Sequence, residues 1–110
     1  MRHSEDFRRT IRRGVRVGRP TLVLHVQAGS EEGIRVGFVV SKAVGGAVAR
    51  NSVKRRLRHL AADRLAETPP GTDVVVRALP RSASAPGELR ADLPSAWSSA
   101  LRRLAERGQS

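Results

Sequence analysis

Lys42–Arg58 reads KAVGGAVARNSVKRRLR, and this stretch carries six basic side chains and no acidic one. Apolar residues recur through it at helical spacing, which predicts a long helix over roughly Ala47–Glu67. The predicted buried stripe of that helix consists of Val53, Leu57, Leu60, Ala61 and Leu65. The basic side chains therefore cover most of the helix surface that the core leaves free.

This distribution of charge is unfavourable for an isolated helix. Cations in the first turn oppose the helix dipole, and like charges one turn apart repel each other. No acidic residue follows until Asp63. Phosphates close by would make the arrangement favourable, with a salt slope of about 0.7 to 0.9 per neutralised phosphate. We therefore predict nucleic-acid binding, and the alternative is an ordinary solvated helix face. The pair Gly45-Gly46 on its own favours a simple connector between a strand and the helix.

Composition supports the same class of partner. The chain has 110 residues, which suits a single domain over residues 1–110, and 21 Lys and Arg against 10 Asp and Glu give a net charge of +11. Such an excess usually implies a polyanionic partner. The absence of cysteine excludes disulfides, thiolate zinc sites and cysteine nucleophiles. No apolar run approaches a membrane span and no signal-peptide core follows Met1, so we expect a soluble, cytoplasmic protein with no membrane partner.

Toward the N-terminus, the sequence predicts a helix capped by Ser4 and closed by Gly14. TLVLHVQA (21–28) and IRVGFVVS (34–41) are predicted strands, and we expect them to pair as an antiparallel hairpin. A further short strand is possible over residues 15–17.

Toward the C-terminus, TDVVVRA (72–78) is apolar on both faces and is predicted to be a central strand. LPRSASAPG (79–87) is predicted to be a flexible loop. A last helical stripe follows, in which Pro94 either kinks the helix or starts its main part. Its members are Leu89, Leu93, Trp97, Leu101 and Leu104. The predicted order, α-β-β-α-β-α, defines an α+β two-layer sandwich of a small sheet and helices.

The residues show no catalytic constellation and no metal site. His3, His25 and His59 have no metal-ligand spacing, and the acidic residues form no cluster suited to Mg²⁺. Ser41 has no accompanying base motif. His25 alternates with apolar residues in its strand, so it either lines a sheet surface or is a satisfied, half-buried histidine.

The run RVGFVVSKAVGGAVARNSVKRRLR, residues 35–58, resembles the signature of the bacterial ribonuclease P protein component. SEDFRRTIRRG, GRPTLVLHV and GTDVVVRA resemble the first helix of that family, a hairpin strand and the strand after the basic helix. The resemblance implies a four-stranded sheet with helices, similar to the second domain of ribosomal protein S5. It also implies an uncommon left-handed β-α-β crossover through the basic helix.

The resemblance implies an RNA-dependent activity. In that family the protein assists a catalytic RNA, which uses Mg²⁺ to cleave precursor tRNA at the 5′ side of the mature end. The protein is thus one component of a ribonucleoprotein endoribonuclease. Its implied partners are the RNA subunit and the 5′ leader of precursor tRNA, with no DNA partner, and Mg²⁺ belongs to the RNA and not to a protein site.

Site residues follow from the same resemblance. The leader would lie in a cleft between the sheet and the first helix, against Phe7, Ile11 and His25. Relatives often have aromatic side chains at the last two positions, so we expect leader binding here to depend more on phosphate charge. The residues that would face the RNA subunit are Lys42, Arg50, Asn51, Lys54, Arg55 and Arg58.

The chain departs from the family pattern at Ala43, Gly46 and Ser52, where the pattern has Lys, Asn and Arg. Extra arginines, at Arg56 and in the first helix, would compensate for the lost contacts. Only three residues precede Ser4, where the family usually has a short basic segment, which suggests a trimmed chain or a late start codon.

Two other functions fit parts of the sequence. A structural rRNA-binding protein of ribosomal type would share the charge and the fold, so only the motif from Ser41 to Arg58 argues against it. A DNA-binding module would need a recognition helix with base-reading side chains clear of its own core stripe. The core stripe of the basic helix makes that alternative the weakest.

Overall fold

The structure is a computed structural model that describes residues 4–29 and 32–108 of the chain. Four strands form one sheet: β1 (Val15–Gly18), β2 (Leu22–Ala28), β3 (Arg35–Val39) and β4 (Thr72–Ala78). The α-helices are α1 (Ser4–Arg13), α2 (Ala47–Ala62), α3 (Arg81–Ser84) and α4 (Pro86–Gly108), and the 3₁₀ helices are η1 (Lys42–Val44) and η2 (Leu65–Glu67). The chain is therefore an α+β protein with a four-stranded mixed sheet, as expected.

The sheet has the strand order β1-β2-β4-β3. β2 is antiparallel to β1 and to β4, whereas β3 runs parallel to β4. The prediction that residues 21–28 and 34–41 form a hairpin is wrong, because β4 lies between them. Apolar alternation shows that two segments are strands but not which strands are neighbours, and β4, buried on both faces, takes the central place. The predictions of a central strand at 72–78 and of an extra strand near Val15 are confirmed.

The parallel pair β3 and β4 is joined through α2, so the basic helix forms the crossover of a β-α-β unit. This connection matches the one that the family resemblance implies. The left hand of the crossover stays a prediction.

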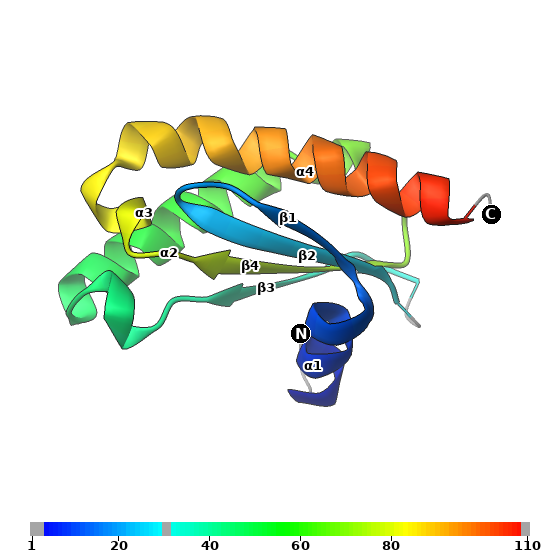
Figure 1. Cartoon of the computed structure of the whole chain (residues 1–110), viewed down its shortest axis with the longest axis horizontal. Coiled ribbons are helices and arrows are strands. Elements are labelled where there is room, and N and C mark those ends of the chain that lie inside the picture. The colour runs from blue at the N-terminus through cyan, green and yellow to red at the C-terminus, as the bar shows by residue number, and fades with distance from the viewer. Residues whose placement is uncertain (1–3, 30–31, 109–110) are drawn as a thin grey trace.

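The hydrophobic core lies between one face of the sheet and the helices α2 and α4 (Figure 1). Trp97 of α4 is fully buried, and its Nε1 donates a hydrogen bond to Thr68 Oγ1 at 2.8 Å. The main contributors to this core are Leu22, Leu24, Val26, Val53, Leu57, Val74, Val76, Leu89, Leu93 and Trp97. Because α2 uses one stripe for this core, its remaining surface is available for other contacts.

The short helix α1 covers part of the opposite face of the sheet (Figure 1). Phe7 of α1 packs on Gly37 of β3, where a Cβ atom would come within 2.6 Å of the ring's Cε1 atom. A residue without a side chain is therefore required there for α1 to approach the sheet.

Two predicted segments differ from the structure. The expected loop at 79–87 contains α3, and α4 already begins at Pro86. Two backbone hydrogen bonds hold α3: the Ser82 amide donates to the Leu79 carbonyl, and the Ala85 amide donates to the Arg81 carbonyl. Proline fixes φ near the helical value, so it starts helices as readily as it marks loops. The basic helix ends at Ala62, and Leu65 is 39% exposed in η2 and absent from the buried stripe.

Candidate nucleic-acid interface

The basic side chains of residues 42–58 lie on two flanks of α2. Arg58 lines a groove with Val36 and Phe38 of β3, whereas Arg56 and His59 face the start of α4. At 100° per residue, Asn51 and Lys54 share the side of Arg58, whereas Arg50, in the first turn, lies in the direction of the core stripe. We call these four residues the β3 flank; they are Arg50, Asn51, Lys54 and Arg58. We call Arg56 and His59 the α4 flank.

Two predicted residues lie outside these flanks. Arg55 is exposed on the outer surface of α2, between the flanks. Lys42 is exposed in η1, directly before the helix. The structure therefore brings all six predicted RNA-subunit residues onto one side of the molecule, around α2.

No basic side chain of residues 42–58 has a hydrogen bond or an ion pair within residues 4–29 and 32–108. The carboxylates of this part of the chain that form ion pairs do so with other arginines. The pairs are Arg35–Asp73 at 2.7 Å, Arg64–Glu67 at 3.4 Å, and Arg81–Glu88. Arg50 is half-buried, and its Nε atom is buried without an acceptor. A buried N–H group without an acceptor costs about 1 to 3 kcal/mol. The Arg50 side chain is therefore suited to bind an external anion.

A connector formed by the two glycines positions α2. Gly45 has φ +152°, which side chains rarely adopt, and its amide donates to the Lys42 carbonyl at 3.2 Å. Gly46 is the N-cap of α2 with an ordinary extended backbone and no side chain to cap the helix. The connector interpretation of the pair is therefore confirmed.

The three predicted leader residues lie on the other face of the sheet. In the sheet, His25 of β2 pairs with Val75 of β4, and Val75 pairs with Gly37 of β3. Paired residues share a face, and the Phe7 ring packs on Gly37. Phe7 and His25 therefore lie on the same face. Phe7 and Ile11 of α1 are both half-buried. We call this surface the α1 face.

His25 is buried, with only 1% of its surface exposed. Neither ring nitrogen has a hydrogen-bond partner, so the interpretation as a satisfied, half-buried histidine is wrong. Burial, together with the positive charges of Arg77 and Arg16, lowers the pKa of His25 to about 4. His25 is therefore neutral at pH 7, and its ring is buried within the α1 face.

Sequence reasoning missed two cations on the α1 face. Arg16 of β1 is directly opposite His25, and Arg77 of β4 is opposite Val23; both side chains are exposed. Each alternates with apolar residues in its strand, but only the strand pairing shows that they surround His25. Arg35 is also on this face, where its Nε and Nη2 atoms donate to Asp73 at 2.9 and 2.7 Å.

Four arginines of α1 add further charge. Arg8, Arg9, Arg12 and Arg13 line a cavity of about 290 Å³ on that helix. Both layers outside the sheet thus carry cationic surfaces.

The described part of the chain lacks two features, a membrane-spanning helix and a cluster of metal ligands. No helix there is both long and apolar enough to cross a bilayer. Within residues 4–29 and 32–108, no three His, Asp or Glu side chains come together as possible metal ligands.

The fold and its cationic surfaces define a small, strongly basic α+β protein with a four-stranded mixed sheet. Comparison with known proteins narrows this class. The family model described as Ribonuclease P matches residues 1–101. The ribonuclease P protein component of Streptomyces bikiniensis is 52% identical over 114 residues, covering 94% of this chain and 89% of that protein. That of Kocuria rhizophila is 54% identical over 106 residues, covering 96% and 94%.

Solved structures give the same result for the fold. The RNase P protein from Thermotoga maritima superposes with a TM-score of 0.73 at 22% identity, covering 94% of each chain. On the family match and the identity to these relatives, the chain belongs to the ribonuclease P protein component family.

Proposed function

We propose that this chain is the protein subunit of ribonuclease P and binds the catalytic RNA through the β3 flank of α2, Arg55 and Lys42. The observation that supports this most is the set of basic side chains around α2 that lack partners in the described residues. Phosphates of an RNA would supply the missing acceptors, and guanidinium groups match phosphate geometry well.

On the opposite face, we propose that the α1 face binds the 5′ leader of precursor tRNA. Phe7 offers an aromatic surface, and the neutral ring of His25 lies on the same face. Arg16 and Arg77 are close enough to His25 to lower its pKa, so they also place positive charge where a leader phosphate would lie. Two faces of one sheet would thus hold two RNA segments.

We assign the cleavage itself to the RNA. The chemistry is hydrolysis of a phosphodiester, and Mg²⁺ bound by the RNA would activate the water and stabilise the leaving oxygen. The protein's own side chains would bind and orient the substrate. Because its cations neutralise phosphates, the RNA would need less Mg²⁺ to fold and to bind the substrate.

The direct test is reconstitution with a bacterial ribonuclease P RNA at low Mg²⁺, following cleavage of a precursor tRNA with a leader. The expected result is faster cleavage with the protein than with RNA alone. Equal rates with and without the protein would contradict the proposal and would leave a ribosomal-type rRNA-binding role.

The division of surfaces is tested by three variants in the same assay. Arg50→Ala and Lys54→Ala should weaken binding to the RNA subunit, whereas Phe7→Ala should chiefly weaken leader binding, by about 1 to 3 kcal/mol if its ring stacks on a base. Arg102→Ala, an exposed arginine near the end of α4, is the charge-matched control. Equal loss of the same step in all three variants would contradict the division.

A further inference from the structure

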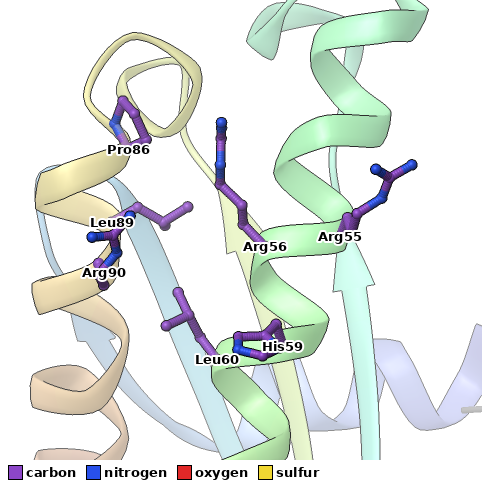
Figure 2. Close-up of a pocket in the computed structure, with 7 residues that line it drawn as sticks. All are labelled: Arg55, Arg56, His59, Leu60, Pro86, Leu89 and Arg90. Carbon is purple, nitrogen blue, oxygen red and sulfur yellow. The ribbon is translucent and has the colours of Figure 1, made fainter.

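A cavity lies on the α4 flank, and of the residues that line it only Arg55 takes part in the function proposed above. It has a volume of about 320 Å³ and lies between α2 and the first turns of α4 (Figure 2). Its walls come from helices that pack against each other, so its shape is set by the fold. The residues that line it are Arg55, Arg56, His59, Leu60, Pro86, Leu89 and Arg90.

The rim of this cavity is cationic. Arg55, Arg56 and Arg90 are exposed, and none has a hydrogen bond or ion pair in the part of the chain that the structure describes. No acidic residue lines the cavity. Glu88, in the first turn of α4, has its carboxylate bound by Arg81, whose Nη2 donates to Oε1 at 2.6 Å. The Glu88 carboxylate is therefore bound by Arg81 and forms no ion pair with an arginine of the rim.

The interior of the cavity is apolar. Figure 2 shows Leu60 of α2 and Leu89 of α4 facing the gap between the helices, with Arg56 reaching into its upper part and Pro86 above Leu89. Leu60 and Pro86 are half-buried, and Leu89 is fully buried beneath them. A simple anion would need only the rim, so the apolar interior indicates a ligand that also has a hydrophobic surface.

An unpaired nucleotide combines these two properties. Its phosphate is an anion, and its base is a flat surface that packs on apolar side chains and on guanidinium planes. The cavity volume is at the lower end of the range for small-ligand sites, about 300 to 1,000 Å³, which suits one nucleotide. The positive end of the dipole of α4 lies at Pro86 and adds to the attraction for phosphate.

We propose that this cavity holds a single unpaired nucleotide of the RNA that lies along α2. Its base would pack against Leu60 and Pro86, and its phosphate would lie between Arg56 and Arg90. The inference rests on the proposed RNA-binding function, and it extends the RNA contact from the β3 flank to the other side of the helix. A paired base inside a duplex cannot enter the cavity, so the site would distinguish unpaired from paired RNA.

The first test uses the full chain with labelled leucine methyl groups, followed by nuclear magnetic resonance. The probes are a short oligouridylate, an RNA duplex of the same length, and uridine monophosphate. We expect the single strand, and the mononucleotide at higher concentration, to shift the methyl resonances of Leu60 and Leu89, and the duplex to leave them in place. Shifts that are the same with the duplex, or absent with the single strand, would overturn the proposal.

The second test compares variants. Arg90→Ala should weaken binding of the oligouridylate roughly five- to tenfold and change duplex binding little, since its contact with the phosphate of the bound nucleotide is lost. Arg102→Ala, on the same helix, is the matched control and should bind both probes like the parent. Equal effects of Arg90→Ala on both probes would overturn the proposal.

Two measurements distinguish an error in the cavity site from an error in the proposed function. Lys54 lies on the β3 flank and does not line the cavity. If Lys54→Ala weakens binding to ribonuclease P RNA while the leucine methyl groups do not respond, the cavity site is wrong and the proposed function remains. If the parent chain shows no preference for any RNA, both are wrong.

Discussion

At the scale of single residues, burial lowers the pKa of His25 and keeps its side chain neutral at pH 7. Its ring is buried on the face of the sheet that α1 packs against, and the positive charges of Arg77 and Arg16 further disfavour its protonation. The lowered pKa means that the folded chain binds a proton on His25 only near pH 4, whereas the unfolded chain binds it near 6.5. The unfolded state therefore binds more protons between these values, and stability must fall as the pH decreases through this window.

This linkage is measurable by urea unfolding at several pH values between 7 and 4. Trp97 is the single tryptophan and is fully buried, so its fluorescence reports unfolding. We expect the His25→Leu variant to lose a part of the acid destabilisation, with a slope difference of at most about 1.4 kcal/mol per pH unit. Parallel curves for the variant and the parent would contradict the account of His25.

The residues of the site were predictable to different degrees. Three members of the β3 flank, Asn51, Lys54 and Arg58, were predictable because helical spacing alone separates them from the core stripe of α2. The burial of His25 was not, because it depends on α1 packing against β2 and β4, and β4 is far from α1 in the sequence. Arg16 and Arg77 were missed because only the strand pairing shows that they lie near His25.

At the scale of elements, the entry into α2 depends on two adjacent glycines with different roles. Gly45 has φ +152°, and a Cβ atom there would come within 2.9 Å of the Ala49 Cβ. Gly46 has φ −73° and ψ −179°, and a Cβ atom there would meet nothing within 4 Å. Only the first glycine is required by the backbone; the second occupies the position where the family pattern has Asn.

We expect Gly45→Ala to destabilise the protein by about 1 kcal/mol or more, since the backbone there disfavours side chains. Gly46→Asn should instead stabilise it by a few tenths of a kcal/mol, because an Asn side chain can cap the helix. Denaturation monitored by Trp97 fluorescence checks both. A loss of stability in both variants, or in neither, would contradict the assignment.

The elements themselves were largely predictable, and their arrangement was not. Apolar periodicity located the strands and both long helices. It failed for the hairpin, since β2 and β3 are separated by β4, which arrives in the sheet after a helical crossover. The short helix α3 was also missed, because Pro80 and Pro86 resemble loop residues in sequence while their φ angles suit helices.

At the scale of the whole molecule, the net charge is +11, and basic side chains lie on both sides of the sheet, on α1 and on α2. The α1 face combines few aromatic surfaces with many arginines, so its affinity for a single-stranded leader should come mainly from phosphates. We expect leader binding, measured with a fluorescent oligonucleotide, to fall steeply with salt, by a log–log slope of about 0.7 per phosphate contact. Leader affinity that hardly changes with salt would contradict this.

We propose that the cations around α2, which lack partners in the described residues, bind phosphates of the RNA subunit. The most direct measurement is the salt dependence of binding to ribonuclease P RNA, for the parent chain and for the double variant Arg50→Ala with Lys54→Ala. Each lost phosphate contact should reduce the log–log slope by about 0.7 to 0.9, so the two together should reduce it by about 1.4 to 1.8. An unchanged slope in the double variant would show that these cations do not touch the RNA.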